Sequence, residues 1–172
     1  MNNRIEIFQG DITGLQVDAI VNAANTSLLG GGGVDGAIHR AAGNELLEYC
    51  RKLNGCSTGQ SKITPGFKLQ AKFVIHTVGP VWRGGNNNED NLLAGCYINS
   101  LKLAVENKIK SIAFPAISTG IYSFPLVRAT RIAIKETKNF LDTDTSIERV
   151  IFVCYDTETF NIYKKEISHI FK

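Results

Sequence analysis

Apolar residues recur with two different periods, and segments of the two kinds alternate along the chain. Short apolar runs predict β-strands at residues 5–8, 19–22, 62–64, 73–77, 111–114 and 150–154. Segments of helical period predict helices at 36–53, 90–107, 127–141 and 159–171. Several strand runs are apolar nearly throughout, as is typical of strands covered on both faces. The pattern therefore predicts an α/β protein.

Length and composition restrict the class further. A chain of 172 residues with 44% hydrophobic content predicts one compact domain. The start of the chain is polar, and no apolar run approaches the ~20 residues of a membrane helix, so we expect a cytoplasmic protein without a membrane partner. The net charge of +3 is too weak a bias to argue for nucleic acid, which we do not expect as a partner, but it suits a small anionic ligand.

The four cysteines form no CxxC pair, and their spacing to the three histidines is not that of a metal site. We therefore expect neither zinc nor a disulfide framework, and this composition favours a reducing compartment.

A glycine-rich loop precedes the first predicted helix. Five of the sixteen glycines fall within residues 30–36, where backbone N–H groups can approach an anion next to a helix N-terminus. Residues 31–36 match GxGxxG, but the strand context of a dinucleotide site is missing, and there is no Walker A lysine. The alternative is a flexible turn with no ligand.

A second loop of this type, residues 116–122, follows the strand predicted at 111–114. Its Ser118, Thr119 and Gly120 suit a phosphate cradle, although an ordinary capped strand-to-helix turn has the same composition. Ligands of open α/β sheets bind beyond the carboxyl ends of the strands, so two such loops together indicate a diphosphate. Neither loop contains Lys or Arg, and binding would rest on backbone donors.

Three further side chains are candidates for a nucleoside. Asp11 follows the first strand and can accept a hydrogen bond from an exocyclic amine such as that of adenine, or can simply cap its own turn. Tyr122 and Phe124 can stack on a base or ribose, or can serve only in packing.

Taken together, these segments resemble the macro domain family, specifically its MacroD-like branch. The resemblance covers residues 5 to about 155 and rests on GDIT at 10–13, VDAIVNAAN at 17–25, GGGVDGAIH at 31–39, HTVGP at 76–80 and FPAISTGIY at 114–122. Members of this branch remove mono-ADP-ribose from proteins and deacetylate O-acetyl-ADP-ribose. The NAAN and GGGVD elements at this spacing are the most specific.

The resemblance implies a three-layer α/β/α fold with a central mixed six-stranded sheet and an ADP-ribose cleft at the strand ends. It implies that Asp11 holds the adenine amine, that Asn25 orients the distal ribose, and that Asp35 and Asn25 are the catalytic pair. The remaining substrate-binding residues that we expect are Ile12, Gly32, Gly33, Val34, Ser118, Thr119, Gly120, Ile121, Tyr122 and Phe124.

The chemistry expected from this resemblance is hydrolysis by water. The sequence has no GxSxG elbow, no plausible Ser/His/Asp set and no metal cluster. Asp35 lies in the first turn of a predicted helix, where the dipole favours its anionic form, so it would act on water as a base or orient it, with or without help from the substrate's α-phosphate. The expected substrates are O-acetyl-ADP-ribose and mono-ADP-ribosylated acidic side chains of proteins, with no cofactor.

Several alternatives stay open at this point. A macro domain can also be a non-catalytic ADP-ribose reader, but Asn25 together with Asp35 favours the hydrolytic branch. His39 shares a helix face with Asp35 and forms either an acid–base dyad or a structural contact. His76 either approaches the cleft or is a hydrogen-bonded core histidine. Tyr155 and Asp156, just past the last strand, are candidates for the adenine end.

Overall fold

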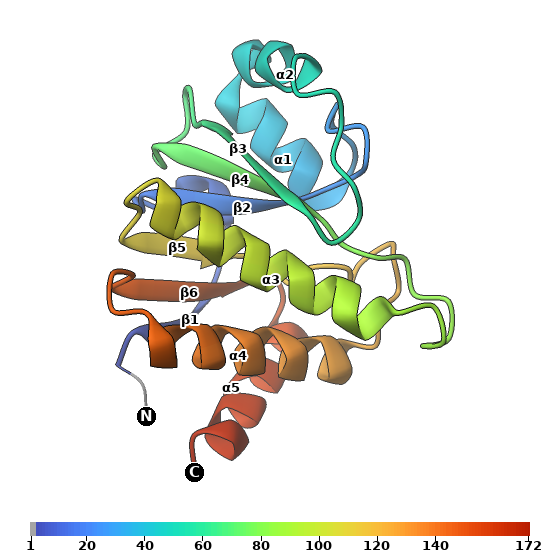
Figure 1. The fold of residues 1–172 in the computed structure, drawn as a ribbon, viewed down its shortest axis with the longest axis vertical. Coiled ribbons are helices and arrows are strands. Elements are labelled where there is room, and N and C mark those ends of the chain that lie inside the picture. Colours follow the sequence, from blue (N-terminus) through green and yellow to red (C-terminus); the bar gives the residue numbers. More distant parts are fainter. Residues whose placement is uncertain (1–2) are drawn as a thin grey trace.

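The computed structural model describes residues 3–172 and contains a six-stranded sheet with the order β1-β6-β5-β2-β4-β3 (Figure 1). Five strands run parallel, and β3 pairs antiparallel with β4 at one edge. Every strand predicted from the sequence is present, within two residues at either end. The strands are β1 (Ile5–Gln9), β2 (Ala19–Ala24), β3 (Ser61–Pro65), β4 (Phe73–Val78), β5 (Ser111–Phe114) and β6 (Arg149–Cys154).

The helices agree with the predicted pattern except at one place. They are the 3-10 turn η1 (Ile12–Gly14), α1 (Gly33–Ala42), α2 (Asn44–Arg51), α3 (Glu89–Glu106), α4 (Leu126–Thr143) and α5 (Thr157–Ile170). The prediction of one helix over residues 36–53 was wrong, because Gly43 has a φ of 86° and separates α1 from α2. The apolar period continues across Gly43, so periodicity alone did not reveal the break.

Alternate residues of the central strands point to opposite faces of the sheet, as the pleat requires. In β2, Ala19 and Val21 join one hydrophobic cluster and Ile20 joins the other. In β5, Ile112 and Ala113 divide in the same way. Residues of α3, α4 and α5 complete the first cluster, and residues of α1 and α2 complete the second. The predicted three-layer α/β/α fold with a mixed six-stranded sheet is confirmed (Figure 1).

Aromatic side chains fill the first cluster between the sheet and its helices. Phe114 of β5 lies 5.0 Å from Tyr97 of α3 and 6.2 Å from Phe152 of β6, measured between ring centroids. Burial of a side chain of this size contributes about 1.5–3 kcal/mol, so the interior anchors each strand up to its last residues. Among residues 3–172, none of the helices combines the length and apolar character that a membrane span requires.

The conformation of Gly43 predicts a stability effect. Gly43→Ala forces an alanine into a positive φ and brings its Cβ to 3.2 Å from Lys68 Cδ, so we expect the free energy of unfolding to fall by about 1–3 kcal/mol. Urea denaturation measures this free energy of unfolding. Gly14→Ala is the control, because its added Cβ meets no atom within 4 Å, and we expect a change of less than about 0.5 kcal/mol. Equal stability of the two variants would contradict the strain argument.

Candidate functional site

The carboxyl ends of the five parallel strands lie at one edge of the sheet, and the predicted site residues follow them. Asp11 comes after β1, residues 115–125 after β5, and Asn25 after β2. Strands β1 and β2 are three steps apart in the sheet, which at the usual interstrand spacing is about 14 Å. The edge therefore presents an elongated row of loops, with Asp11 towards one end and Asn25 towards the other.

Asp11 caps η1 and is exposed. Its Oδ1 accepts hydrogen bonds from Thr13 Oγ1 at 2.7 Å and Thr13 N at 2.9 Å. These donors hold the pKa of Asp11 below its ordinary value, so Asp11 is a carboxylate at neutral pH. Neither donor uses Oδ2, and the cap is compatible with a ligand contact. Ile12, predicted beside it, has its side chain buried in the core, which leaves its backbone for a ligand.

The glycine loop ends in helix α1, whose N-cap is Gly32 without a side-chain cap. The first amides of a helix have no partner within the helix and are available as donors to an anion. A Cβ added at Gly32, Gly33 or Gly120 would meet no atom within 4 Å, so these glycines border open space. Gly33 also has a φ of 57°. Both loops therefore offer exposed backbone around the same edge, as predicted.

Asn25 organises the turn that leads from β2 into the glycine loop. Its Nδ2 donates to Gly30 O at 2.9 Å, and its Oδ1 accepts from Ser27 Oγ at 2.7 Å and from Leu28 N at 3.1 Å. One Nδ2 hydrogen is left over for another acceptor. Asn25 is therefore a fixed donor on a braced loop.

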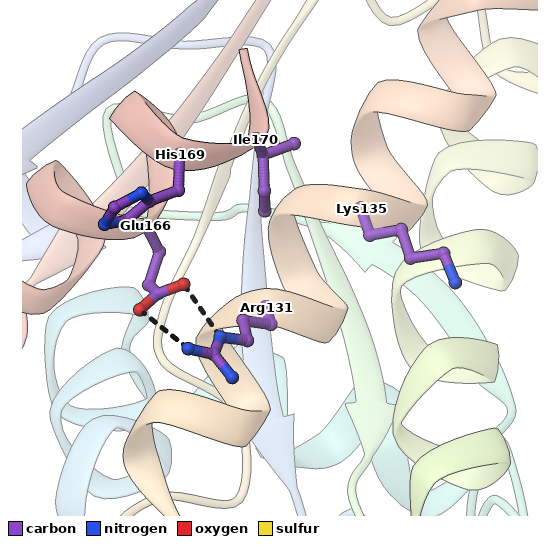
Figure 2. A pocket seen from close by; sticks show the side chains of 5 residues that line it. All are labelled: Arg131, Lys135, Glu166, His169 and Ile170. Atoms are coloured by element: carbon purple, nitrogen blue, oxygen red, sulfur yellow. Dashed lines mark hydrogen bonds and ion pairs between the residues drawn. The ribbon is translucent and has the colours of Figure 1, made fainter. Parts of the chain in front are cut away.

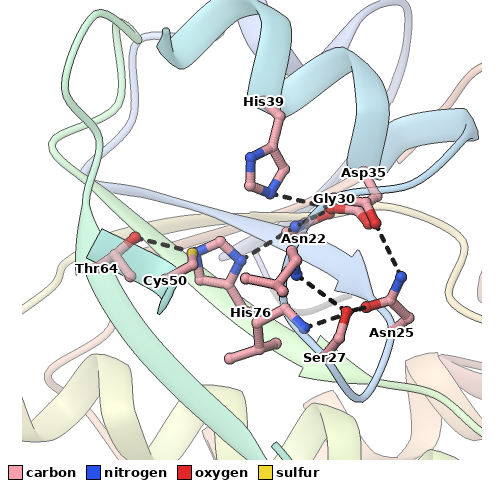
Figure 3. Close-up of polar contacts among 11 residues, drawn as sticks. Asn22, Asn25, Ser27, Gly30, Asp35, His39, Cys50, Thr64 and His76 are labelled. Carbon is pink, nitrogen blue, oxygen red and sulfur yellow. Dashed lines mark hydrogen bonds and ion pairs between the residues drawn. The ribbon is translucent and has the colours of Figure 1, made fainter. Parts of the chain in front are cut away.

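Asp35 is 4% exposed and lies against the glycine loop (Figure 3). Its Oδ1 accepts from Asn22 Nδ2 at 2.8 Å and lies 3.4 Å from His39 Nε2. Its other oxygen faces Gly31, because a Cβ added there would be 3.1 Å from Asp35 Oδ2 and 3.5 Å from Asn25 Nδ2. The structure therefore brings Asn25, Gly31 and Asp35 together, with Oδ2 on the side of Asn25.

The sequence-based expectation considered only the helix dipole at Asp35, and burial acts on its pKa in the opposite direction. Burial raises the pKa of Asp35 above its ordinary value, and the hydrogen bond from Asn22 and the proximity of His39 offset only part of this. A carboxylate inside the protein loses more solvation than a first-turn position returns. The raised pKa suits a group that accepts a proton during a reaction.

The second loop is a tight turn held by its own hydrogen bonds. Ser118 has a φ of 65°, and its carbonyl accepts from Phe124 N at 2.9 Å. Gly120 O accepts from Ser123 N at 2.9 Å, and Thr119 Oγ1 donates to Ala116 O at 2.9 Å. Within the described residues, Ser118 Oγ is buried without a hydrogen-bond partner. Residues in left-handed conformations direct successive N–H groups into a concave surface that accommodates anions.

The aromatic predictions for this loop need a correction. Phe124 is only 2% exposed, and its ring packs 4.8 Å from that of Trp82, so it offers no free face to a base or ribose. Tyr122 is half-buried, whereas Ile121 at the tip is 87% exposed. Just past the neighbouring strand β6, Tyr155 is 86% exposed. Its neighbour Asp156 caps α5 by accepting from Thr159 N at 2.7 Å.

A third loop, residues 79–88, supports the second one, and sequence analysis assigned it no role. A Cβ added at Gly79 would overlap Ser118 Oγ, so the end of β4 touches the second loop. Trp82 N donates to Tyr122 O at 2.8 Å. The only sequence signal was the Gly-Pro pair at 79–80, which indicates a turn but not its neighbour.

Glu89, at the start of α3, holds this third loop. Its carboxylate accepts from the backbone N–H groups of Arg83 at 2.9 Å, Gly85 at 2.9 Å and Asn87 at 2.6 Å. Burial works against the charge of Glu89, but these backbone donors prevail and lower its pKa to about 2. The folded loop therefore depends on an ionised glutamate.

No group of three or more His, Cys, Asp or Glu side chains within residues 3–172 is arranged to hold a metal ion. A surface hollow lies between α4 and α5, where Arg131 forms an ion pair with Glu166 at 2.8 Å beside Lys135, His169 and Ile170 (Figure 2). None of these residues belongs to the strand-end loops. The hollow is therefore separate from the site at the edge of the sheet.

The fold and the site together define an α/β protein with anion-suited loops at the carboxyl edge of its sheet. Residues 21–133 match the family model described as Macro domain. A Macro domain-containing protein of Methanosarcina mazei is 60% identical over 168 residues, covering 98% of this chain and 90% of that protein. The chain belongs to the macro domain family.

A relative with a more specific name and two solved structures agree with this family assignment. A protein of Escherichia fergusonii named O-acetyl-ADP-ribose deacetylase is 57% identical over 169 residues, with 96% of each chain covered. The Oceanobacillus iheyensis macrodomain with ADP superposes with a TM-score of 0.92 at 42% identity, covering 97% of this chain and 91% of that one. The Trypanosoma brucei macrodomain in complex with ADP-ribose gives 0.90 at 46% identity, covering 95% and 69%.

The role of Glu89 can be tested without any ligand. Glu89→Gln removes the charge that holds three backbone amides, so we expect hydrogen exchange at Arg83, Gly85 and Asn87 to become at least about tenfold faster. In the wild type this stabilisation is complete above the ordinary glutamate pKa of 4.5 and is lost as the pH falls towards 2.

The control for this experiment is Asp90→Asn. Asp90 is the neighbouring acid, and it pairs at the surface with Arg128. We expect this substitution to leave exchange in the 83–87 segment unchanged. Unchanged exchange in Glu89→Gln would show that the loop does not depend on the carboxylate.

Proposed function

We propose that this chain is a hydrolase that binds ADP-ribose and cleaves the ester between a ribose oxygen and an acyl group. Its substrates would be O-acetyl-ADP-ribose and mono-ADP-ribosylated acidic side chains of proteins. The observation that carries the proposal is the position of Asp35 Oδ2 beside Asn25 and Gly31, at the end of a glycine loop that borders open space. The relative named O-acetyl-ADP-ribose deacetylase, 57% identical, supports it.

The row of loops suits the parts of ADP-ribose in order. Asp11 keeps a free carboxylate oxygen for the adenine amine at the β1 end. The backbone donors around Gly32 and Ser118 would enclose the diphosphate, and these loops contain no Lys or Arg. Asn25 would then direct its spare Nδ2 hydrogen to the distal ribose. The separation of about 14 Å between the β1 and β2 strands fits an extended ligand.

Hydrolysis would use water as the nucleophile. Asp35 Oδ2 accepts a proton from water, and the resulting hydroxide attacks the acyl carbon. The bond between that carbon and the ribose oxygen breaks, and the ribose oxygen takes up the proton from Asp35. The products are a carboxylic acid and a ribose hydroxyl. A general base contributes ~10²–10⁴ in rate, so positioning by Asn25 and the loops supplies the remainder.

We also assign the protein to the cytoplasm. All four cysteines are buried free thiols, which suits a reducing compartment.

A reader that binds ADP-ribose without cutting it is the competing function. The position of Asp35 Oδ2 beside Gly31 and Asn25 favours the enzyme, because a reader has no need to place a carboxylate of raised pKa beside the ribose.

The function is tested by comparing the wild type with Asp35→Asn on O-acetyl-ADP-ribose and on a glutamate-ADP-ribosylated protein. We expect kcat to fall ~10²–10⁴-fold while the Kd for ADP-ribose changes little, because the near-isosteric amide preserves the packing but cannot accept the proton. Product release is followed by chromatography and binding by calorimetry, with and without a chelator. Tight binding by a wild type that releases no product would identify a reader instead.

The adenine contact is tested by Asp11→Asn. Asparagine caps a turn about as well as aspartate, so the stability of the fold is retained while the free acceptor is lost. We expect the affinity for ADP-ribose to fall about 10- to 100-fold, as for one charge-assisted hydrogen bond, and the affinity for ribose 5-phosphate to stay the same. Equal losses for both ligands would place Asp11 away from the adenine.

A further inference from the structure

A chain of buried polar side chains leads from Asp35 across three adjacent strands (Figure 3). Asn22 on β2 donates through Nδ2 to Asp35 Oδ1 at 2.8 Å and lies 3.1 Å from His76 Nδ1 on β4. His76 Nε2 lies 3.0 Å from Thr64 Oγ1 on β3, and Thr64 Oγ1 donates to Pro65 O at 3.1 Å. Asn22, His76 and Thr64 are all at most 1% exposed.

The hydrogen-bond chemistry gives this chain one direction. The amide nitrogen of Asn22 is a donor only, so His76 Nδ1 must accept and carries no proton. The neutral ring of His76 then has its proton on Nε2 and donates it to Thr64, whose own hydroxyl proton goes to Pro65 O. Every donor in the series is matched with an acceptor.

This direction fixes the orientation of the Asn22 amide. A flipped amide would place its oxygen against two acceptors, Asp35 Oδ1 and His76 Nδ1, and both hydrogen bonds would become repulsive. Asn22 Oδ1 is buried without a partner among residues 3–172, so no other contact there holds the amide in place. The orientation of Asn22 therefore depends on its two acceptors, and His76 is the one that is not part of the reaction.

We propose that His76 is a positioning residue that keeps the Asn22 amide nitrogen directed at Asp35 and thereby keeps the catalytic carboxylate supplied with a donor. This inference rests on the proposed role of Asp35 as the base and extends it to a residue on β4, the strand next to that of Asn22. The Thr64 hydroxyl takes part by accepting the Nε2 proton, which selects the tautomer that leaves Nδ1 free.

The other titratable groups around Asp35 come from the elements packed against it. His39 on α1 lies 3.4 Å from Asp35 Oδ1, and Cys50 on α2 lies close enough that the charge of Asp35 adds to burial in raising the thiol pKa to about 11. Burial, with a smaller contribution from His39, lowers the pKa of His76 to about 3. His76 therefore stays neutral over the working pH range. Because His39 lies so close to Asp35, the experiment has to follow the Asp35 carboxyl group directly.

Two substitutions of His76 form a matched pair. In His76→Asn, the side-chain oxygen takes the place of Nδ1, so the acceptor for Asn22 is kept while the contact with Thr64 is lost. In His76→Gln, the amide reaches the place of Nε2, so the contact with Thr64 is kept while the acceptor for Asn22 is lost. A purely structural role would make the two variants similar.

The readout is the titration of the Asp35 carboxyl carbon, followed by NMR with ¹³C-labelled aspartate and identified by comparison with Asp35→Asn. A donor that is no longer held in place stabilises the carboxylate less, so we expect the midpoint to rise by about 1 pH unit in His76→Gln and by less than about 0.3 in His76→Asn. The acid limb of the kcat profile moves by the same amounts, because activity requires the carboxylate.

Two further measurements keep the proposal testable if a His76 variant does not fold. In the wild type, ring ¹⁵N shifts of His76 are expected to show a proton on Nε2 and none on Nδ1, and Thr64→Val is expected to shift the Asp35 midpoint in the same direction as His76→Gln. A proton on Nδ1, or equal midpoints in His76→Asn and His76→Gln, would overturn the proposal. Shifted midpoints in a protein that releases no product would uphold the positioning role and reject the hydrolase.

Discussion

The parallel pairing of β2 with both β4 and β5 is the constraint on which the site depends. It directs the three strands to end at the same edge, so the loops after them must share that space. Contacts between these loops then follow: Gly79 meets Ser118, and Trp82 binds the backbone of Tyr122. Gly32, Gly33 and Gly120 border open space at this edge, so backbone contributes much of the surface of the site. The rigid sheet therefore fixes the directions in which the backbone N–H groups of these loops point.

Asp35 illustrates the opposing forces in such a site. Its burial disfavours the charged form, and a single amide from Asn22 restores part of the lost solvation. Glu89 is buried as well, yet three backbone donors from the preceding loop keep its pKa low. Two carboxylates at one edge of a sheet thus have opposite proton affinities because one is surrounded by donors and the other is not. The raised pKa of Asp35 suits proton transfer, and the low pKa of Glu89 suits the support of a loop.

Much of this could be predicted from the sequence, for identifiable reasons. The strands were predicted because their apolar runs are buried on both faces, and the two loops at the strand ends because glycine and hydroxyl residues cluster there. The break at Gly43 was missed because the apolar period continues through it. The burial of Phe124 against Trp82 and the burial that raises the pKa of Asp35 were missed because both depend on packing between segments that are distant in the chain. Contacts between loops leave no periodic signal.

Cys50 has a chemical consequence of its own. Its sulfur lies 3.9 Å from His76 Nε2, within the polar region behind Asp35, yet burial and the Asp35 charge raise its thiol pKa to about 11. Only the thiolate reacts with electrophiles and peroxides, and at pH 7 a thiol with this pKa is ionised in about one molecule in 10⁴. Cysteine-directed inhibitors would therefore find almost no nucleophile here, and oxidative stress would leave the sulfur reduced. Burial, with the Asp35 charge adding to it, thus keeps the neighbouring sulfur unreactive.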